Sequence, residues 1–178
     1  MNKPSSSLII ALAVLVILGV GGFFIVKSNT DARNLEISEA EKKKKVQAQE
    51  YIASSQEKLV LAGKTQNADE KARYIQEAIV DARNATTLDP NNYETFFNLG
   101  TIYTLLAPSV ENSAEFALAS FDKAIELNSN CGKCYRNAGL VYAHLGKTAE
   151  AKINFQKAYD LEPEGSAEKA MLEKWLAE

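Results

Sequence analysis

The sequence has few of the residues on which active-site chemistry usually depends. Its 178 residues include two cysteines and one histidine, whereas a structural zinc normally takes four ligands of these types. We therefore expect no metal and no other cofactor. A net charge of −3 and the lack of a basic cluster interleaved with aromatics argue against nucleic acid as a partner. The carboxylates are scattered without a pairing typical of acid and base catalysis, so an enzyme is not expected.

A long apolar run near the N-terminus is the first feature that is present. Residues 8–26 contain no charged residue, Pro, Asn or Gln, and as a helix they match the roughly 30 Å thickness of a bilayer core. A cleaved signal has a shorter run and small residues at its cleavage site, but Phe23, Phe24 and Ile25 are bulky. The sequence therefore predicts a seven-residue tail (residues 1–7) followed by one uncleaved transmembrane helix (8–26).

The orientation of that helix follows less directly from charge. Lys3 precedes the run while Lys27 and Arg33 follow it, so the rule that places positive residues in the cytoplasm nearly cancels. A short tail before a single anchor favours export of the large domain that follows. We predict a single-pass membrane protein with an extracytoplasmic soluble domain; the alternative is an inverted anchor with a cytoplasmic domain.

A charged segment, residues 27–48, comes next. Glu39 and Glu41 each stand four residues before a lysine, the better orientation for an ion pair along a helix. Apolar residues are too sparse for a wide buried face. The segment is predicted to be a solvated helical stalk, with contact between Lys42–Lys45 and anionic lipid headgroups as the alternative.

One spacing of small and apolar residues then occurs three times. Copies begin at Ala78, Ala117 and Ala151, each followed by Ala or Phe four residues on, Ala three further and Leu three further. Two copies follow a segment with its own shared spacing, Phe96-x2-Leu99-Gly100-x2-Tyr103 and Tyr135-x2-Ala138-Gly139-x2-Tyr142. No strand pattern is found. We predict an all-α fold of antiparallel helix pairs, in which small residues lie where two helices cross and aromatic side chains fill the surrounding space.

This pattern resembles the tetratricopeptide repeat (TPR), a 34-residue helical hairpin, and in particular the membrane-anchored TPR proteins of bacteria. The resemblance implies a helical-hairpin solenoid over residues 49–165. Its three repeats are expected at about 49–92, 93–131 and 132–165. About ten extra residues precede Ala78, and about five are added at Ala107–Asn112. Residues 166–178 place Met171, Leu172 and Trp175 on one stripe, as in the capping helix that a solenoid needs.

The resemblance also implies a function: a scaffold or adaptor that binds a protein or an extended peptide in the concave groove of the first helices. Asn98 and Asn137 would bond an extended backbone through their amides, and Lys133 and Arg136 would suit a carboxylate. The family's groove positions fall on seven residues of this sequence: Phe97, Asn98, Thr101, Lys133, Arg136, Asn137 and Leu140.

The segment Cys131-Gly132-Lys133-Cys134 allows three interpretations. Both cysteines fit small-residue packing positions between repeats, both could form a structural disulfide, or the pair could serve a thiol–disulfide oxidoreductase. A thioredoxin-like site would follow a strand, and no strand is predicted. The oxidoreductase and a self-assembling structural module are the alternatives to the adaptor function.

The anchor hypothesis predicts that residues 1–26 are retained in the mature protein, because the apolar run lacks a good cleavage site. Mass spectrometry of the intact protein from the membrane fraction measures this directly. A soluble protein whose mature N-terminus lies near Arg33 would contradict the hypothesis.

Overall fold

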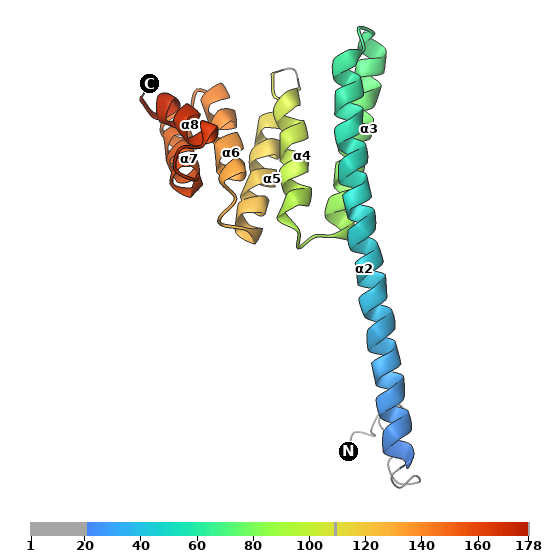
Figure 1. The fold of residues 1–178 in the computed structure, drawn as a ribbon. Helices are drawn as coiled ribbons and strands as arrows, with labels where there is room; N and C mark the ends of the chain where they lie inside the picture. Colours follow the sequence, from blue (N-terminus) through green and yellow to red (C-terminus); the bar gives the residue numbers. More distant parts are fainter. Residues whose placement is uncertain (1–20, 109, 178) are drawn as a thin grey trace, which may run out of the picture. The chain divides into compact units, whose positions relative to one another are not determined.

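The computed structural model describes residues 21–108 and 110–177, with side chains from Arg33 onward. Within these residues every regular element is an α-helix, which confirms the predicted fold class. The elements, shown in Figure 1, are α2 (Gly21–Lys64), α3 (Ala68–Leu88), α4 (Tyr93–Leu106), α5 (Ser113–Leu127), α6 (Gly132–His144), α7 (Thr148–Leu161) and α8 (Ala167–Ala177).

The chain divides into two compact units, residues 1–43 and 44–178. In the first unit the described residues, 21–43, belong to α2, and the side chains of residues 33–43 are exposed. The predicted membrane span, residues 8–26, lies outside the described residues up to position 20. No helix in the described part of the chain is both long and apolar enough to cross a bilayer.

The second unit is a series of helical hairpins. The part of α2 from Lys44 pairs with α3, α4 pairs with α5, and α6 pairs with α7 (Figure 1). Polar caps set where two of the helices begin: the Asn67 side chain accepts hydrogen bonds from the backbone of Asp69 and Glu70 at the start of α3, and Asn92 caps α4. The turns after α6 and α7 use Gly146 and Gly165 with φ of 71° and 77°, a conformation that side chains disfavour.

The extra residues of the first two repeats adopt different structures: one set is helical and the other forms a turn. Those before Ala78 continue as helix, so α3 has 21 residues whereas α5 has 15. The insertion at Ala107–Asn112 instead lengthens a turn, in which Asn112 adopts a left-handed φ of 61° before α5 starts. Asparagine tolerates this conformation better than most residues.

Glycines under aromatic rings set the close crossing within two hairpins. A Cβ atom built on Gly100 would lie 2.7 Å from Phe121 Cε1, and one built on Gly139 would lie 2.5 Å from Phe155 Cε1. Phe121 is fully buried and Phe155 nearly so. The Phe121 ring belongs to a core with Tyr103 and neighbouring apolar side chains. The structure thus confirms the packing role predicted for these glycines.

Helix α8 covers the last hairpin. Leu172 is fully buried, and the centroid of the Trp175 ring lies 4.9 Å from that of Phe155. These two residues, on one stripe of α8, cover the apolar face that α7 would otherwise expose.

The crossing geometry predicts that Gly139→Leu destabilises the protein by about 1–3 kcal/mol, because a side chain there displaces the Phe155 ring from a filled core. Gly63→Ala is the matched control: a Cβ atom at that helical position has no neighbour within 4 Å. Thermal unfolding followed by circular dichroism compares the two variants. Equal melting points would mean that the Gly139 crossing is not a constraint.

Candidate partner-binding groove

The first helices of the three hairpins open onto a shared hollow of about 280 Å³. Helix α2 contributes Gln49 and Gln56, α4 contributes Glu94, Phe97 and Asn98, and α6 contributes Lys133. We call this the groove hollow. Three residues predicted from sequence therefore meet in one place, from helices that are remote along the chain.

Lys133 is the cation of the groove hollow. Its Nζ atom lies 4.4 Å from the centroid of the Phe97 ring and 5.4 Å from that of Tyr93, distances typical of a cation–π contact. The nearest carboxylate oxygen, Glu94 Oε1, is 3.9 Å away, and both side chains are about two-fifths exposed. A pair of this kind contributes little stability. The rings therefore position the ammonium group while part of it remains open to a ligand.

Tyr93 contributes a neutral group to the same region. Burial, together with the nearby charge of Glu94, raises the pKa of the Tyr93 phenol. Its hydroxyl lies 3.4 Å from Glu94 Oε1, to which it donates a hydrogen bond. Glu94 therefore has two partners within the chain before any ligand arrives.

Asn98 differs from what the sequence suggested. It is only 4% exposed, its Nδ2 donates to Ser55 Oγ at 2.7 Å, and its Oδ1 accepts from Gln56 Nε2 at 3.4 Å. Both ends of the amide are thus engaged inside the chain. Its main contact joins α4 to α2, so the prediction that this amide is free to bond a partner's backbone needs correction.

The remaining predicted positions keep more of their polar surface. Arg136 and Asn137 are partly exposed on α6, where Arg136 Nε donates to Asn137 Oδ1 at 3.4 Å. Thr101 is partly exposed as well, but its hydroxyl donates to the Phe97 carbonyl of its own helix at 2.9 Å. Arg136 is therefore the second cation on the exposed face of α6.

Leu140 does not line the groove hollow. It lies at a second hollow, of about 360 Å³, formed by α6, α7 and α8. We call this the cap hollow. Its lining is Leu140, Ala143, Thr148, Ala151, Lys152, Phe155 and Trp175.

Sequence reasoning missed Glu94, Gln49 and Gln56. Glu94 was within reach, because it stands one helical turn before Phe97 and so lies on the same face of its helix. The two glutamines could not be predicted from the sequence, because the register of the first helix against the second hairpin depends on contacts such as that between Ser55 and Asn98.

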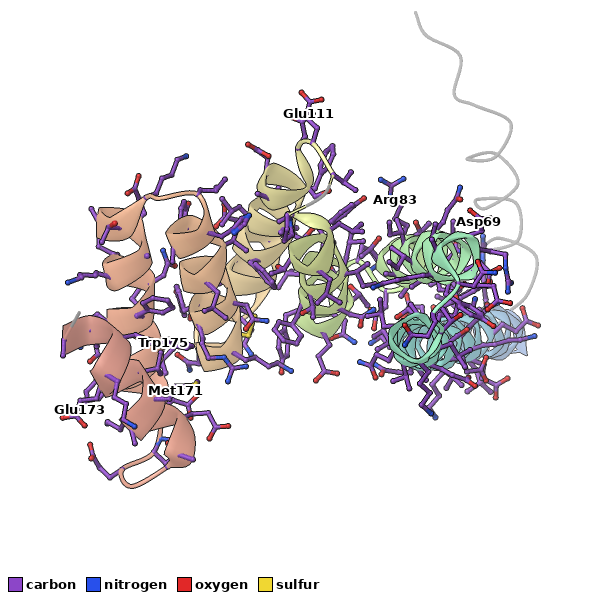
Figure 2. The ribbon with its side chains drawn as sticks, turned by 90° about the horizontal axis from the view of Figure 1, so that it is seen from above. Asp69, Arg83, Glu111, Met171, Glu173 and Trp175 are labelled. Atoms are coloured by element: carbon purple, nitrogen blue, oxygen red, sulfur yellow. A yellow bond between two sulfur atoms is a disulfide. The ribbon has the colours of Figure 1, made fainter. Side chains whose placement is uncertain are left out.

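The two cysteines form a disulfide (Figure 2). Cys131 is 4% exposed and Cys134 fully buried, in a cluster with Ala124 and with Tyr93, Phe96 and Phe97 of α4. Two of the three interpretations therefore hold together: the cysteines are packed between repeats, and they form a disulfide. Reactive cysteine pairs are partly exposed, so this burial argues against a thiol–disulfide oxidoreductase.

Comparison with known proteins agrees with this architecture. A family model described as a tetratricopeptide repeat matches residues 133–164. Among characterised proteins, a UDP-N-acetylglucosamine–peptide N-acetylglucosaminyltransferase of Giardia intestinalis is 37% identical over 87 residues. The matched region is 49% of this chain but 6% of the transferase.

Solved structures show the same fold. A thermophilic TPR protein of Thermus thermophilus superimposes with a TM-score of 0.64 at 19% identity, over 72% of this chain and 63% of that one. The TPR2B domain of yeast Sti1, in a pHsp70 complex, gives 0.61 at 15% identity, over 74% and 94%. The second TPR domain of human RPAP3, in complex with an HSP70 peptide, gives 0.52 at 20% identity, over 74% and 98%.

The contrast between the two groove asparagines yields a prediction. Asn98→Ala should destabilise the protein by about 1 kcal/mol, because it removes a buried hydrogen bond to Ser55 between two hairpins. Asn137→Ala, at the same repeat position but partly exposed, is the control and should change stability little. Urea unfolding of both variants measures the difference. A smaller loss for Asn98→Ala than for Asn137→Ala would contradict the bridging role.

Proposed function

We propose that this chain, a tetratricopeptide-repeat protein, is a scaffold that holds an extended segment of a partner protein in the groove hollow. The observation that carries the proposal is the convergence of three first helices, α2, α4 and α6, on one partly polar depression. Such convergence needs three repeats in register, which is what a solenoid provides.

The chemistry of the hollow favours an acidic segment. Helix α6 carries Lys133 and Arg136 and has no acidic residue between Gly132 and His144. Lys133 keeps exposed donor capacity, and a carboxylate would gain charge-assisted hydrogen bonds there. The exposed Gln49 side chain offers a donor and an acceptor to an extended backbone, and the exposed Gln56 side chain, whose Nε2 donates to Asn98, offers its Oε1 as an acceptor.

Similar folds support peptide binding as the activity. Two of the TPR domains compared above are described in complexes, one with an HSP70 peptide and one with pHsp70. Because these domains are only 15% and 20% identical to this chain, the comparison supports a shared fold and does not identify the partner. Binding without catalysis also fits the buried disulfide, whereas a self-assembling module would leave the partly exposed cations of α6 without a role.

We also propose that residues 8–26 anchor the protein in a membrane as a single span, with the TPR unit on the extracytoplasmic side. The apolar run supports the anchor. The disulfide between Cys131 and Cys134 supports the side, because disulfides persist in oxidising compartments and are rare in the cytosol.

The function is tested by reversing charge in the groove. Lys133→Glu combined with Arg136→Glu should abolish crosslinking of the full chain to its partner in membranes, because the partner's carboxylates would meet like charge. Lys71→Glu with Lys174→Glu is the control, since it makes the same change in net charge at exposed residues of α3 and α8.

Both double variants should keep the helical circular-dichroism signal and melting point of the parent. Equal crosslinking by the groove variant and the parent would reject the groove as the partner site. Loss of crosslinking in the control as well would attribute the effect to net charge and not to the groove.

A further inference from the structure

We propose that the cap hollow is an anchor pocket that takes one aromatic or large aliphatic side chain of an acidic partner segment bound along α6. The inference rests on the proposed function, because it assigns a second subsite to the same ligand. The partner's chemistry is thereby narrowed to a carboxylate and an apolar side chain at a fixed separation.

The lining of the cap hollow is mostly apolar. Its apolar lining comes from three helices: Leu140 and Ala143 of α6, Ala151 and Phe155 of α7, and Trp175 of α8, which Figure 2 labels. Its volume of about 360 Å³ falls at the lower end of the range for pockets that bind small ligands. A single large side chain is therefore a suitable occupant.

Apolar surface at this hollow remains open to water. Leu140 is 38% exposed and the Trp175 ring, although it packs on Phe155, is partly exposed. Burying such surface contributes about 25 cal/mol per Å². An aromatic partner side chain would bury Leu140 and stack beside two rings already in contact, an arrangement that favours aromatic over polar occupants.

The two hollows lie along one face of α6. Lys133 lines the groove hollow and Leu140 lines the cap hollow; seven residues separate them, which is nearly two turns or about 10 Å. An extended chain advances about 3.3 Å per residue. A partner would therefore place its carboxylate and its apolar side chain about three residues apart.

Charge at the cap hollow agrees with that at the groove hollow. Lys152 lines the cap hollow, and Arg136 lies on α6 between Lys133 and Leu140. Among the described residues that line either hollow, Glu94 is the single acid, and Lys133 lies beside it. A segment that crosses from one hollow to the other meets mainly positive charge, so an acidic segment is the occupant that the surface fits.

The sequence supplies a reporter for the experiment, because Trp175 is the single tryptophan of the chain. The protein is the full chain in lipid nanodiscs, which avoids detergent in the hollow. The probes are fluorescein-labelled, capped peptides containing Glu-Ser-Ser-Phe or the reverse order, Phe-Ser-Ser-Glu. Matched peptides carry Ala in place of Phe, or Glu directly beside Phe. Anisotropy measures affinity, and unlabelled peptides are titrated while Trp175 emission is recorded.

We expect at least one of the two Phe peptides to bind and to change Trp175 emission. Replacing its Phe by Ala should weaken binding about tenfold or more, since burying a phenyl ring contributes about 1.5–3 kcal/mol. Ala143→Phe in the protein should cause a similar loss by filling the hollow from an exposed position. Ala119→Phe, at an exposed alanine of α5 outside both hollows, should bind like the parent.

Three results of the peptide titrations would overturn the inference: no change in Trp175 emission with either Phe peptide, equal binding of the Phe and Ala peptides, or parental affinity in Ala143→Phe. An emission change that depends on protein concentration without peptide would assign the hollow to a second copy of the chain, also against the inference. If only the cap-hollow inference is wrong, Lys133→Glu combined with Arg136→Glu still weakens peptide binding. If the proposed function is also wrong, this double variant binds the peptides like the parent.

Discussion

The close crossing of helices within the second and third hairpins is the constraint on which the rest of the molecule depends. At Gly100 and Gly139 an aromatic ring from the second helix occupies space that any side chain would need. The rings of Phe121 and Phe155 fill that space and are almost fully buried. With the two backbones held this close, Phe97 packs against Phe121 and also lines the groove hollow, so the core and the hollow share this side chain.

Much of this arrangement could be predicted from the sequence because its signals are local and repeated. The recurrence of Ala117 and Ala151 with their aromatic partners specifies which faces pack. The extra residues before Ala78 were expected within the first repeat, and the structure shows that they lengthen α3, whose start is capped by the Asn67 side chain.

The site was less predictable because its details depend on contacts between remote segments. Asn98 and Asn137 share one repeat position, but Asn98 faces Ser55 from a helix 43 residues earlier and becomes a structural bridge. Leu140 was assigned to the groove from its position in the repeat, and its actual neighbour, Trp175, comes from the cap. Repeat position specifies a face of a helix, whereas the packed neighbours decide which groups on that face remain free.

The last helix, α8, has two roles in this short array of hairpins. Among the residues that the structure describes, the first helices of the hairpins are α2, α4 and α6, and they line one shared depression. Helix α8 packs on α7: Leu172 closes the core, while Trp175, three residues on, lines the cap hollow together with Leu140 of α6. Residues three apart on a helix are neighbours on its surface, so one stripe of this short helix both closes the core through Leu172 and lines the cap hollow through Trp175.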